Sequence, residues 1–561
     1  MPVHPDRSSV HALRERPQAD VLIIGGGVNG LATLRDLALQ GVDVALVEAV
    51  DYCSGASGAS SHMIHGGIRY LENGEFRLVR ESVQERNRLV KIAPHVVKPL
   101  RTVIPISTLF SGIIAAPLRM LTHRQGKPAP RGAALIKVGL MMYDIFSRDG
   151  GTLPRHRLRG PKATRAAFPD FPAKMRYSAS YFDASVHEPE RMSIDLLHDA
   201  IAAGARASNH VRASGFAGGK VLLRDERTGD TFDFAARVVL NASGPWTDLT
   251  NAALGERTTL MGGTKGSHIM LDNPELAAAT GGNEIFFENT DGRIVLIYPM
   301  NGNVMVGTTD LEADPSEPAV CTEAEVDYFF ELVRLVFPRI SLDRSQIVYR
   351  FSGIRPLPRH GDLAPGFVSR DYRVVSSKVG GTDVLSLVGG KLTTFRALGQ
   401  SLSQRITDML GVTRRVDTRT LPIGGGAGFP VDTTDQEQWA IRKRGALSVD
   451  RALQLLRRYG TRSADFIRFT PEERPLGAAP DYSVEELVWL VRSEQVATVC
   501  DLIQRRTNLA MSGRVSDELL IEVTGILSDE LAWSTDDAAR ELDAARNQLH
   551  DRHGLRLVQT A

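Results

Sequence analysis

The first part of the chain alternates between short apolar runs and apolar residues at helical spacing. Residues 20–24, Asp followed by four apolar residues, predict a short buried β-strand. Apolar side chains then recur at helical spacing over residues 31–38, and Gly41 ends that run as a helix stop does. A second strand is predicted at residues 44–47, with Glu48 directly after it. This order predicts the start of a β-α-β unit.

The pattern changes further along the chain. Residues 221–234 alternate like two strands around a turn, and residues 262–310 resemble several strands joined by Gly and Asn turns, which predicts an antiparallel sheet. After the glycine-rich residues 421–428 the strand signals end, and a helical bundle is predicted. One of its helices starts at Ser483 with Glu486 three residues on, the pattern of a capping box. Another carries six apolar residues on one face: Leu519, Leu520, Val523, Ile526, Leu527 and Leu531.

Two stretches between these parts carry many charges. Residues 76–92 have helical spacing and many charged residues, so we expect a half-exposed helix. Residues 101–165 contain twelve Lys or Arg but only two acidic residues, interleaved with apolar runs at 109–121 and 133–143.

Length and composition set limits. A chain of 561 residues is too long for one core, so we expect two or three domains. The net charge of +1 indicates no polyanionic partner and therefore no nucleic acid. Cys53, Cys321 and Cys500 lack metal-ligand spacing, which argues against a zinc site or a disulfide framework and for a reducing compartment. We see no apolar signal core at the N-terminus and no apolar run long enough to span a bilayer.

The clearest motif is GGGVNG at residues 25–30, directly after the first predicted strand. Gly25 permits the tight turn, Gly27 lets a pyrophosphate approach the backbone, and Gly30 lets the helix pack on the strand. The start of a helix also attracts phosphate through its N–H groups and its dipole. Glu48 follows Gly30 by eighteen positions, where a carboxylate can accept hydrogen bonds from ribose hydroxyls. Dinucleotide binding is predicted, but the motif alone does not separate FAD from NAD.

Seven later motifs resemble, in order, those of the FAD-dependent glycerol-3-phosphate dehydrogenases of the respiratory, quinone-linked type. The resemblance covers about residues 18–550. The motifs are SGASGASSHMIHGGIRYLENGEFRLVRE (54–81), NASGPW (241–246), TKGSHI (264–269), VGTTD (306–310), FSGIRPL (351–357), SRDY (369–372) and GGKLTTFR (389–396).

The resemblance implies a mixed fold, α/β plus α+β. A glutathione-reductase-like, FAD-binding Rossmann domain is expected from the discontinuous residues 17–80, 176–250 and 375–425. An antiparallel-sheet substrate domain is inserted at residues 81–175 and 251–374, and a helical domain at 426–561 ends the chain. The independent β-α-β and sheet patterns agree with this order.

The resemblance also implies the reaction that the protein catalyses. Hydride would pass from sn-glycerol 3-phosphate to flavin N5, giving dihydroxyacetone phosphate, and electrons would pass to a quinone. His65 is the candidate base because its ordinary pKa suits proton transfer at neutral pH; the alternative is a histidine that only packs against the flavin. Lys265 would orient the substrate hydroxyl or stabilise reduced flavin, and the alternative is a surface lysine.

Phosphate binding is assigned to arginines. The candidate phosphate clamp consists of Arg355 and Arg370, since guanidinium groups bind phosphate bidentately. Arg355 is also a candidate catalytic residue. Arg69 and Tyr70 would add a charge and a hydroxyl. The alternative for each arginine is a solvated surface residue. Lys391 and Thr393 would close the substrate site. The FAD contacts implied by the motifs are Gly25, Gly26, Gly27, Asn29, Gly30, Glu48, Ser57, Ser60, Ser61, Ala242, Ser243, Gly244, Gly390, Lys391, Leu392 and Thr393.

Two departures leave the substrate open. His62 stands where many relatives carry Lys, and the run FDASVHEPERM (182–192) is one residue longer around His187 than in relatives. The same chemistry on another polyol phosphate, such as erythritol phosphate, is the second hypothesis, and an oxygen-reducing oxidase is the third. A non-catalytic FAD protein would not need His65, Lys265 and the arginines, and an NAD-linked enzyme would need a second glycine motif.

Residues 101–165 raise the question of a membrane. Basic side chains beside apolar ones can rest on an anionic bilayer, and quinone-linked relatives do so. Together with the resemblance, this implies a cytoplasmic protein that is peripheral on the inner face of the cytoplasmic membrane. The alternative is that the apolar runs are core helices and the charges are solvated. Whether two chains form a homodimer is left open.

Overall fold

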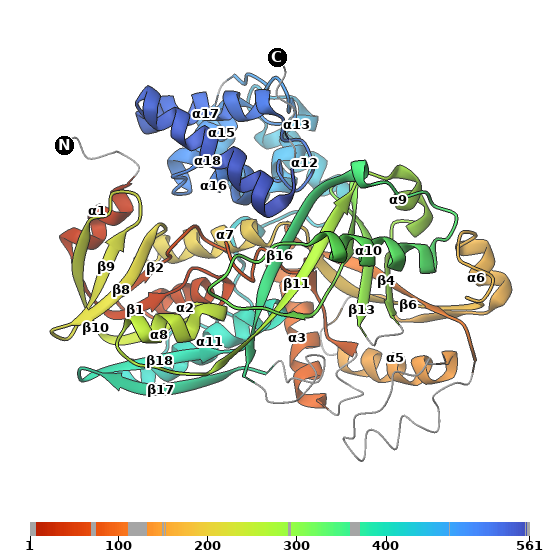
Figure 1. Cartoon of the computed structure of the whole chain (residues 1–561), viewed down its shortest axis with the longest axis horizontal. Helices are drawn as coiled ribbons and strands as arrows, with labels where there is room; N and C mark the ends of the chain where they lie inside the picture. The colour runs from red at the N-terminus through yellow and green to blue at the C-terminus, as the bar shows by residue number, and fades with distance from the viewer. Residues whose placement is uncertain are drawn as a thin grey trace.

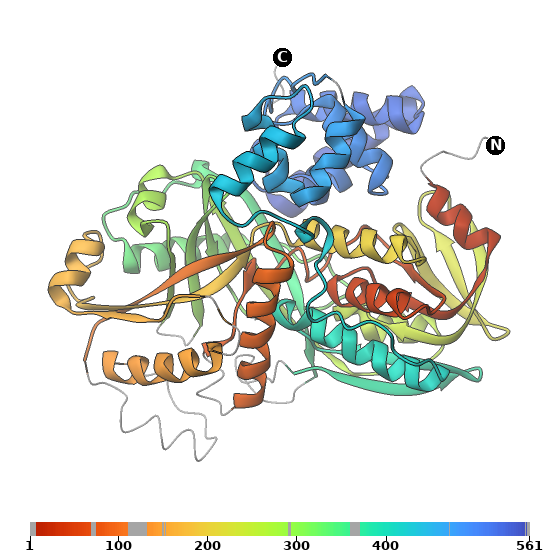
Figure 2. The same cartoon turned by 180° about the vertical axis from the view of Figure 1, so that it is seen from behind.

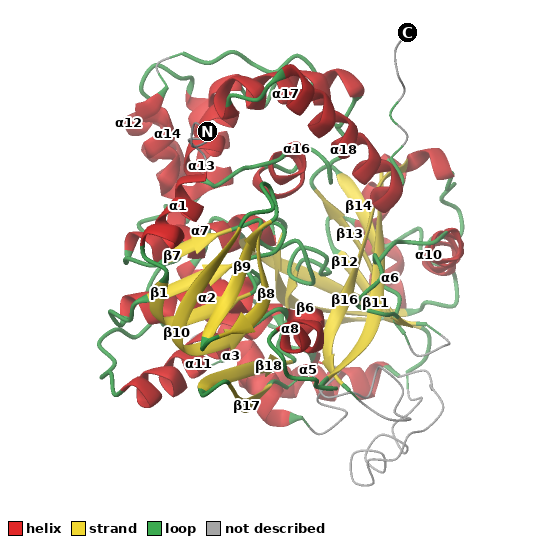
Figure 3. Ribbon diagram, turned by 60° about the vertical axis from the view of Figure 1, so that its left-hand side comes forward, coloured by secondary structure: helices red, strands yellow, loops and turns green. Residues whose placement is uncertain are grey.

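Two β-sheets lie side by side, and a group of helices from the C-terminal part of the chain rests across them (Figure 1, Figure 3). The computed structural model describes residues 7–68, 75–109, 132–148, 151, 153–289, 293–359, 371–470, 472–555 and 557.

The first sheet has eight strands and contains the glycine motif. Its strand order is β17-β18-β10-β1-β2-β7, and β8 and β9 extend it from β10. The four pairings among β18, β10, β1, β2 and β7 are parallel. The bounds are β1 (Gln18–Ile24), β2 (Val44–Val47), β7 (Arg206–Ser208), β8 (Val211–Ala217), β9 (Lys220–Asp225), β10 (Thr231–Asn241), β17 (Arg373–Val379) and β18 (Thr382–Val388).

Three helices cover one face of this sheet: α2 (Val28–Leu39), α7 (Pro189–Ala202) and α11 (Phe395–Leu410) (Figure 2). The other face is covered by α1 (Ser8–Glu15), α8 (Thr247–Ala253) and the β8–β9 hairpin. Because parallel strands buried on both faces need apolar residues, the second half of β1, at residues 21–24, is continuously apolar and buried rather than alternating.

The second sheet has ten strands and is antiparallel except where β12 pairs with β4. Its order is β15-β11-β14-β13-β12-β4-β6-β3, with β16 on β11 and β5 on β6. The bounds are β3 (Met63–Ile64), β4 (Val97–Ile106), β5 (Arg157–Arg159), β6 (Tyr177–Val186), β11 (Met261–Leu271), β12 (Glu284–Glu288), β13 (Ile294–Met300), β14 (Asn303–Gly307), β15 (Leu311–Glu312) and β16 (Ile347–Pro358).

Helices cover this sheet as well. α9 (Pro274–Thr280) and α10 (Glu323–Val336) share one apolar core with it, and α3 (Phe76–Ile92) and α5 (Ala133–Ser147) share another with β4 and β6. α6 (Pro161–Ala167) lies beside β5 and β6.

The C-terminal bundle is confirmed. Its helices are α12 (Thr433–Lys443), α13 (Val449–Tyr459), α14 (Ser463–Phe469), α15 (Val484–Ser493), α16 (Val499–Asp501), α17 (Asp517–Leu531) and α18 (Thr535–His553). Their core extends onto the second sheet through Met270, Tyr298 and Tyr349. Ser483 caps α15 as predicted, but the Glu486 carboxylate accepts from Arg451, Arg458 and Tyr459 instead of closing a capping box.

The early elements match the sequence pattern closely, and β2 and α3 have the predicted bounds. α3 differs in burial, because Glu85 and Arg86 are fully buried rather than solvated. β3 and β6 pair within the second sheet, although the predicted FAD-domain segments include both. The domain bounds stay predictions.

Most of the apolar run 109–121 lies outside the described residues, which resume at 132. Among the helices of the described ranges, none has the length and hydropathy to cross a membrane.

Candidate functional site

The glycine turn joins β1 to α2 at the carboxyl edge of the parallel strands. Gly25 has φ +117°, and a Cβ there would lie 2.6 Å from the Ala242 carbonyl oxygen at the end of β10. A Cβ on Gly30 would lie 2.0 Å from the Gly25 carbonyl oxygen. Both positions therefore require glycine, and they hold the start of α2 against two strand ends.

The start of α2 is suited to a pyrophosphate. Gly27 is the N-cap residue, so no cap side chain shields the first amides, and Ser57 Oγ accepts from Val28 N at 3.0 Å. Beside them, the buried Asn29 Oδ1 has no hydrogen-bond partner among the described residues. The other side-chain atom, Asn29 Nδ2, faces the loop at Gly390, which has φ +106°. A helix start beside a buried acceptor in need of a donor fits a bound dinucleotide.

Glu48 lies at the end of β2, as the spacing predicted. Its carboxylate accepts from Gly26 N at 2.7 Å and from Val50 N at 2.9 Å, so it shapes the glycine turn. Its contact with the ribose stays a prediction. Burial raises the pKa of Glu48 above its ordinary value, and the two amides oppose that shift.

The other small residues form local hydrogen bonds. Ser60 Oγ accepts from His62 N at 3.2 Å, and Ser61 Oγ lies 2.8 Å from His268 Nε2. Ser243 Oγ donates to Asn241 Oδ1 at 2.6 Å, directly after β10, where Gly244 has φ +63°. The two segments predicted to contact FAD, residues 57–61 and 242–244, thus lie on loops that follow different strands, β2 and β10.

The two departures from the family pattern contact each other. His62 is buried, and burial lowers its pKa to about 4, so its ring is neutral near neutral pH. Its Nδ1–H donates to the His187 carbonyl oxygen at 2.7 Å. A hydrogen bond from a neutral ring therefore joins the two positions.

His65 lies directly after β3 and is half-buried. Its backbone N–H donates to Thr393 Oγ1, and the Thr393 hydroxyl donates to its carbonyl oxygen, both at 3.1 Å. Thr393, on the short 3-10 helix at Leu392–Thr394, thus contacts the candidate base directly. Lys391 Nζ donates to Ser82 Oγ on α3 at 3.1 Å.

Arg355 extends from β16 over the flat surface left by Gly266 of β11. A Cβ at Gly266 would lie 2.1 Å from an Arg355 guanidinium nitrogen. The guanidinium donates to Asp310 Oδ1 at 3.0 Å, to Thr308 Oγ1 at 3.1 Å and to the Thr309 carbonyl oxygen at 2.9 Å. The matched motif VGTTD therefore orients the candidate phosphate-binding side chain.

The same face of β16 contacts the nucleotide-binding segment. A Cβ on Gly353 would lie 2.5 Å from Ala59 Cβ. Because residues two apart on a strand share a face, Arg355 emerges beside the Ser57–Ser61 segment.

Lys265 lies on the opposite face of β11. Its ammonium donates to Glu325 Oε2 of α10 at 2.8 Å and to the Val320 carbonyl oxygen at 2.6 Å. Adjacent strand residues point to opposite faces, so the structure does not bring Lys265 together with Arg355. Arg69, Tyr70 and Arg370 lie outside the described residues.

Sequence reasoning missed two buried ion pairs on α3. Arg86 donates to Asp183 Oδ1 of β6 at 2.8 Å, and Arg396 binds Glu85 with two hydrogen bonds of 2.6 and 2.8 Å. The sequence of an amphipathic helix does not show which of its charged residues will form buried ion pairs, because the partners are far away in the sequence.

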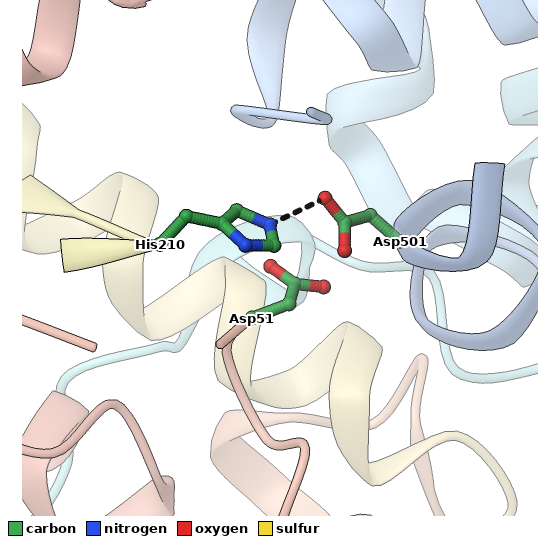
Figure 4. A group of neighbouring side chains, drawn as sticks. All are labelled: Asp51, His210 and Asp501. Atoms are coloured by element: carbon green, nitrogen blue, oxygen red, sulfur yellow. Dashed lines mark hydrogen bonds and ion pairs between the residues drawn. The ribbon is translucent and has the colours of Figure 1, made fainter. Parts of the chain in front are cut away.

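Asp51, His210 and Asp501 form a buried cluster between the first sheet and the C-terminal helices (Figure 4). His210 Nε2 lies 2.9 Å from Asp501 Oδ2. Arg506 donates to both oxygens of Asp51, at 2.8 and 2.9 Å. The guanidinium supplies the positive charge here, and the cluster acts as a contact between domains.

Comparisons with known proteins agree with this geometry. A family model described as FAD dependent oxidoreductase matches residues 20–396, and one described as the C-terminal domain of alpha-glycerophosphate oxidase matches residues 416–538. A glycerol-3-phosphate dehydrogenase of Synechocystis sp. is 32% identical over 554 residues, covering 93% of this chain and 95% of that protein. A D-erythritol 1-phosphate dehydrogenase of Brucella abortus is 32% identical over 514 residues, covering 88% and 95%.

A solved structure, the glycerol-3-phosphate dehydrogenase from Bacillus halodurans complexed with FAD, shares the fold. It has a TM-score of 0.73 and 21% identity, and the match covers 98% of this chain and 97% of that one. The expected fold class is thus confirmed: an FAD-binding Rossmann domain, a sheet-rich substrate domain and a helical C-terminal domain. FAD is the cofactor. The chain belongs to the FAD-dependent glycerol-3-phosphate dehydrogenase family.

Proposed function

We propose that this protein oxidises sn-glycerol 3-phosphate to dihydroxyacetone phosphate and passes the electrons to a quinone. FAD, when bound, accepts the hydride from the carbon that bears the secondary hydroxyl. The observation that carries the proposal is Arg355, fixed by Asp310 and emerging beside the segment that builds the nucleotide site. An oriented guanidinium at that place anchors a phosphate while the rest of a short substrate reaches the cofactor.

The remaining roles follow from the motifs and contacts. His65 takes the hydroxyl proton, since its backbone is fixed and its ordinary pKa suits that transfer. Arg370, Arg69 and Tyr70 complete the phosphate site, and Lys391 closes it beside α3. Lys265, paired with Glu325, is assigned no step.

Arg355→Ala tests the anchor. Loss of a charge-assisted hydrogen bond should weaken glycerol 3-phosphate binding roughly 10- to 100-fold. Binding of unphosphorylated glycerol should not change. Arg350→Ala is the matched control, because Arg350 lies on the opposite face of β16, paired with Glu323. Equal losses for glycerol and glycerol 3-phosphate would contradict an anchor for phosphate.

Erythritol phosphate is the second candidate substrate. The D-erythritol 1-phosphate dehydrogenase of Brucella abortus is as similar to this chain, at 32% identity, as the Synechocystis protein. The ratio of kcat/KM for the two phosphates decides between them. A higher kcat/KM for erythritol phosphate would make it the substrate of the same oxidation reaction.

The proposed membrane surface rests on α5. Val138, Met141 and Ile145 are 55%, 50% and 59% exposed and lie at helical spacing on one face, with Lys137 beside them. An exposed apolar stripe flanked by basic residues can insert at an anionic bilayer surface. Met141→Glu should reduce sedimentation with vesicles that contain phosphatidylglycerol. Ile441→Glu, an equally exposed position on α12, should not. Equal sedimentation of both variants and the unaltered protein would remove α5 as the membrane contact.

A further inference from the structure

We infer that Tyr143, Asp183 and Thr393 form a clamp on the backbone of His65 and Gly66, and that this clamp positions the imidazole for proton transfer. The inference deepens the proposed function and rests on it. Tyr143 lies on α5 and Asp183 on β6, so three elements distant in sequence converge on one dipeptide.

The first half of the clamp is Thr393. Its single hydroxyl accepts from His65 N and donates to His65 O, each at 3.1 Å. These two bonds use the hydroxyl as both acceptor and donor. Thr393 is buried, so water does not compete strongly for either bond.

The second half holds the next peptide group. Gly66 N lies 2.9 Å from Tyr143 Oη and 3.1 Å from Asp183 Oδ1. The Tyr143 hydroxyl donates to Asp183, which leaves a lone pair to accept from Gly66 N–H. A Cβ on Gly66 would lie 2.3 Å from the Tyr143 hydroxyl oxygen, so glycine is needed for this close contact.

Arg86 fixes the acceptors. Its guanidinium donates to Asp183 Oδ1 at 2.8 Å and to Tyr143 Oη at 3.0 Å, and both charged side chains are buried. Burial, reinforced by the Asp183 charge, raises the pKa of Tyr143 well above its ordinary value. The phenol therefore keeps its proton, and the hydrogen bonds keep their direction, across the neutral pH range.

The consequence is geometric. Peptide groups are planar, so fixing the groups on both sides of the His65 Cα fixes its φ and ψ. The direction of the Cα–Cβ bond is then set, and only the side-chain torsions of the imidazole remain. Nothing in the contacts of Tyr143 or Asp183 requires them to touch substrate, so they are positioning residues.

Matched substitutions test the clamp. Tyr143→Phe and Thr393→Val remove its hydroxyls. Tyr181→Phe is the control for the first, because Tyr181 is buried in the same cluster and packs edge-on against Tyr143. Thr393→Ser keeps the hydroxyl and should recover part of the flavin reduction rate that Thr393→Val loses. Under anaerobic single-turnover conditions with saturating glycerol 3-phosphate, the two test variants should reduce their flavin roughly 10- to 100-fold more slowly. FAD content and substrate affinity should be unchanged in Tyr143→Phe, and Tyr181→Phe should reduce its flavin near the wild-type rate.

A double-mutant cycle distinguishes positioning from general stability. If Tyr143 acts through His65, adding Tyr143→Phe to His65→Asn should slow flavin reduction no further. A full additional loss in that background, or a wild-type rate in both test variants, would overturn the inference.

Amide hydrogen exchange measures the clamp without substrate. The peptide containing residues 65 and 66 should exchange faster in Tyr143→Phe than in Tyr181→Phe, and faster in Thr393→Val than in Thr393→Ser. Equal exchange in both comparisons would overturn the clamp. Failure of wild-type flavin to be reduced by any polyol phosphate would instead overturn the proposed function, so the two failures are distinguishable.

Discussion

Gly25 illustrates how much of the nucleotide site depends on single residues. Its φ of +117° and the Ala242 carbonyl oxygen 2.6 Å from a hypothetical Cβ are separate reasons for glycine. The GxGxxG spacing and Glu48 were predictable from sequence because each requirement is local: a turn, a helix start and a strand end. The ion pair of Lys265 was not predictable, because its partner Glu325 lies 60 residues further along the chain, on α10.

Gly25→Ala should therefore abolish FAD binding, because the backbone would have to shift in the turn that is predicted to contact the pyrophosphate. Gly229→Ala is the control, since Gly229 also has positive φ, +79°, but open space around it. Bound FAD per chain after gel filtration gives the result. Normal FAD content in Gly25→Ala would contradict the proposed role of the turn.

At the scale of elements, α3 shows what a periodic pattern can and cannot predict. Its bounds followed from residues 76–92 alone, because helix formation is largely local. The burial of Glu85 did not, since its partner Arg396 lies 311 positions away on α11. α3 thus holds the GGKLTTFR segment in place, because Ser82 contacts Lys391 and Glu85 contacts Arg396.

Arg396→Met should lower the free energy of unfolding by about 3 kcal/mol, because it leaves the buried Glu85 carboxylate without its main partner. Arg492→Met breaks the more exposed pair with Glu530 and should cost less than about 1 kcal/mol. Chemical denaturation of both holoproteins measures the difference. Similar losses in the two variants would mean that the Glu85 pair is no stronger than a surface one.

At the scale of the whole molecule, buried ion pairs fasten the C-terminal helices to the first sheet. Arg191 of α7 binds both oxygens of Glu494, and Arg506 binds both oxygens of Asp51. The two sheet-containing parts and the helical bundle were predictable from motif order and apolar periodicity. The ion pairs between these parts were not predictable, because they depend on which charged residues meet after folding.

These contacts predict an acid-labile interface. Burial opposes ionisation of Glu494, yet Arg191 and His198 outweigh it and hold its pKa far below its ordinary value. A depressed carboxyl pKa stabilises the fold above the unfolded value of about 4.3, and that stability is lost as pH falls toward the folded pKa.

The gap in thermal midpoint between wild type and Glu494→Gln should therefore be widest at neutral pH and should shrink as pH falls from about 4.3 to about 3. Glu530→Gln, on an exposed pair, should show a small gap throughout. A gap for Glu494→Gln that stays constant with pH would contradict the role of its charge.

The most direct test of the account is anaerobic mixing of the purified holoprotein with glycerol 3-phosphate while the visible flavin band is followed. The account predicts rapid bleaching by the phosphate, none by glycerol at the same concentration, and recovery of the band on adding a quinone analogue. An oxidised flavin that persists with glycerol 3-phosphate and with erythritol phosphate alike would contradict the assignment of Arg355 and His65 to polyol phosphate oxidation.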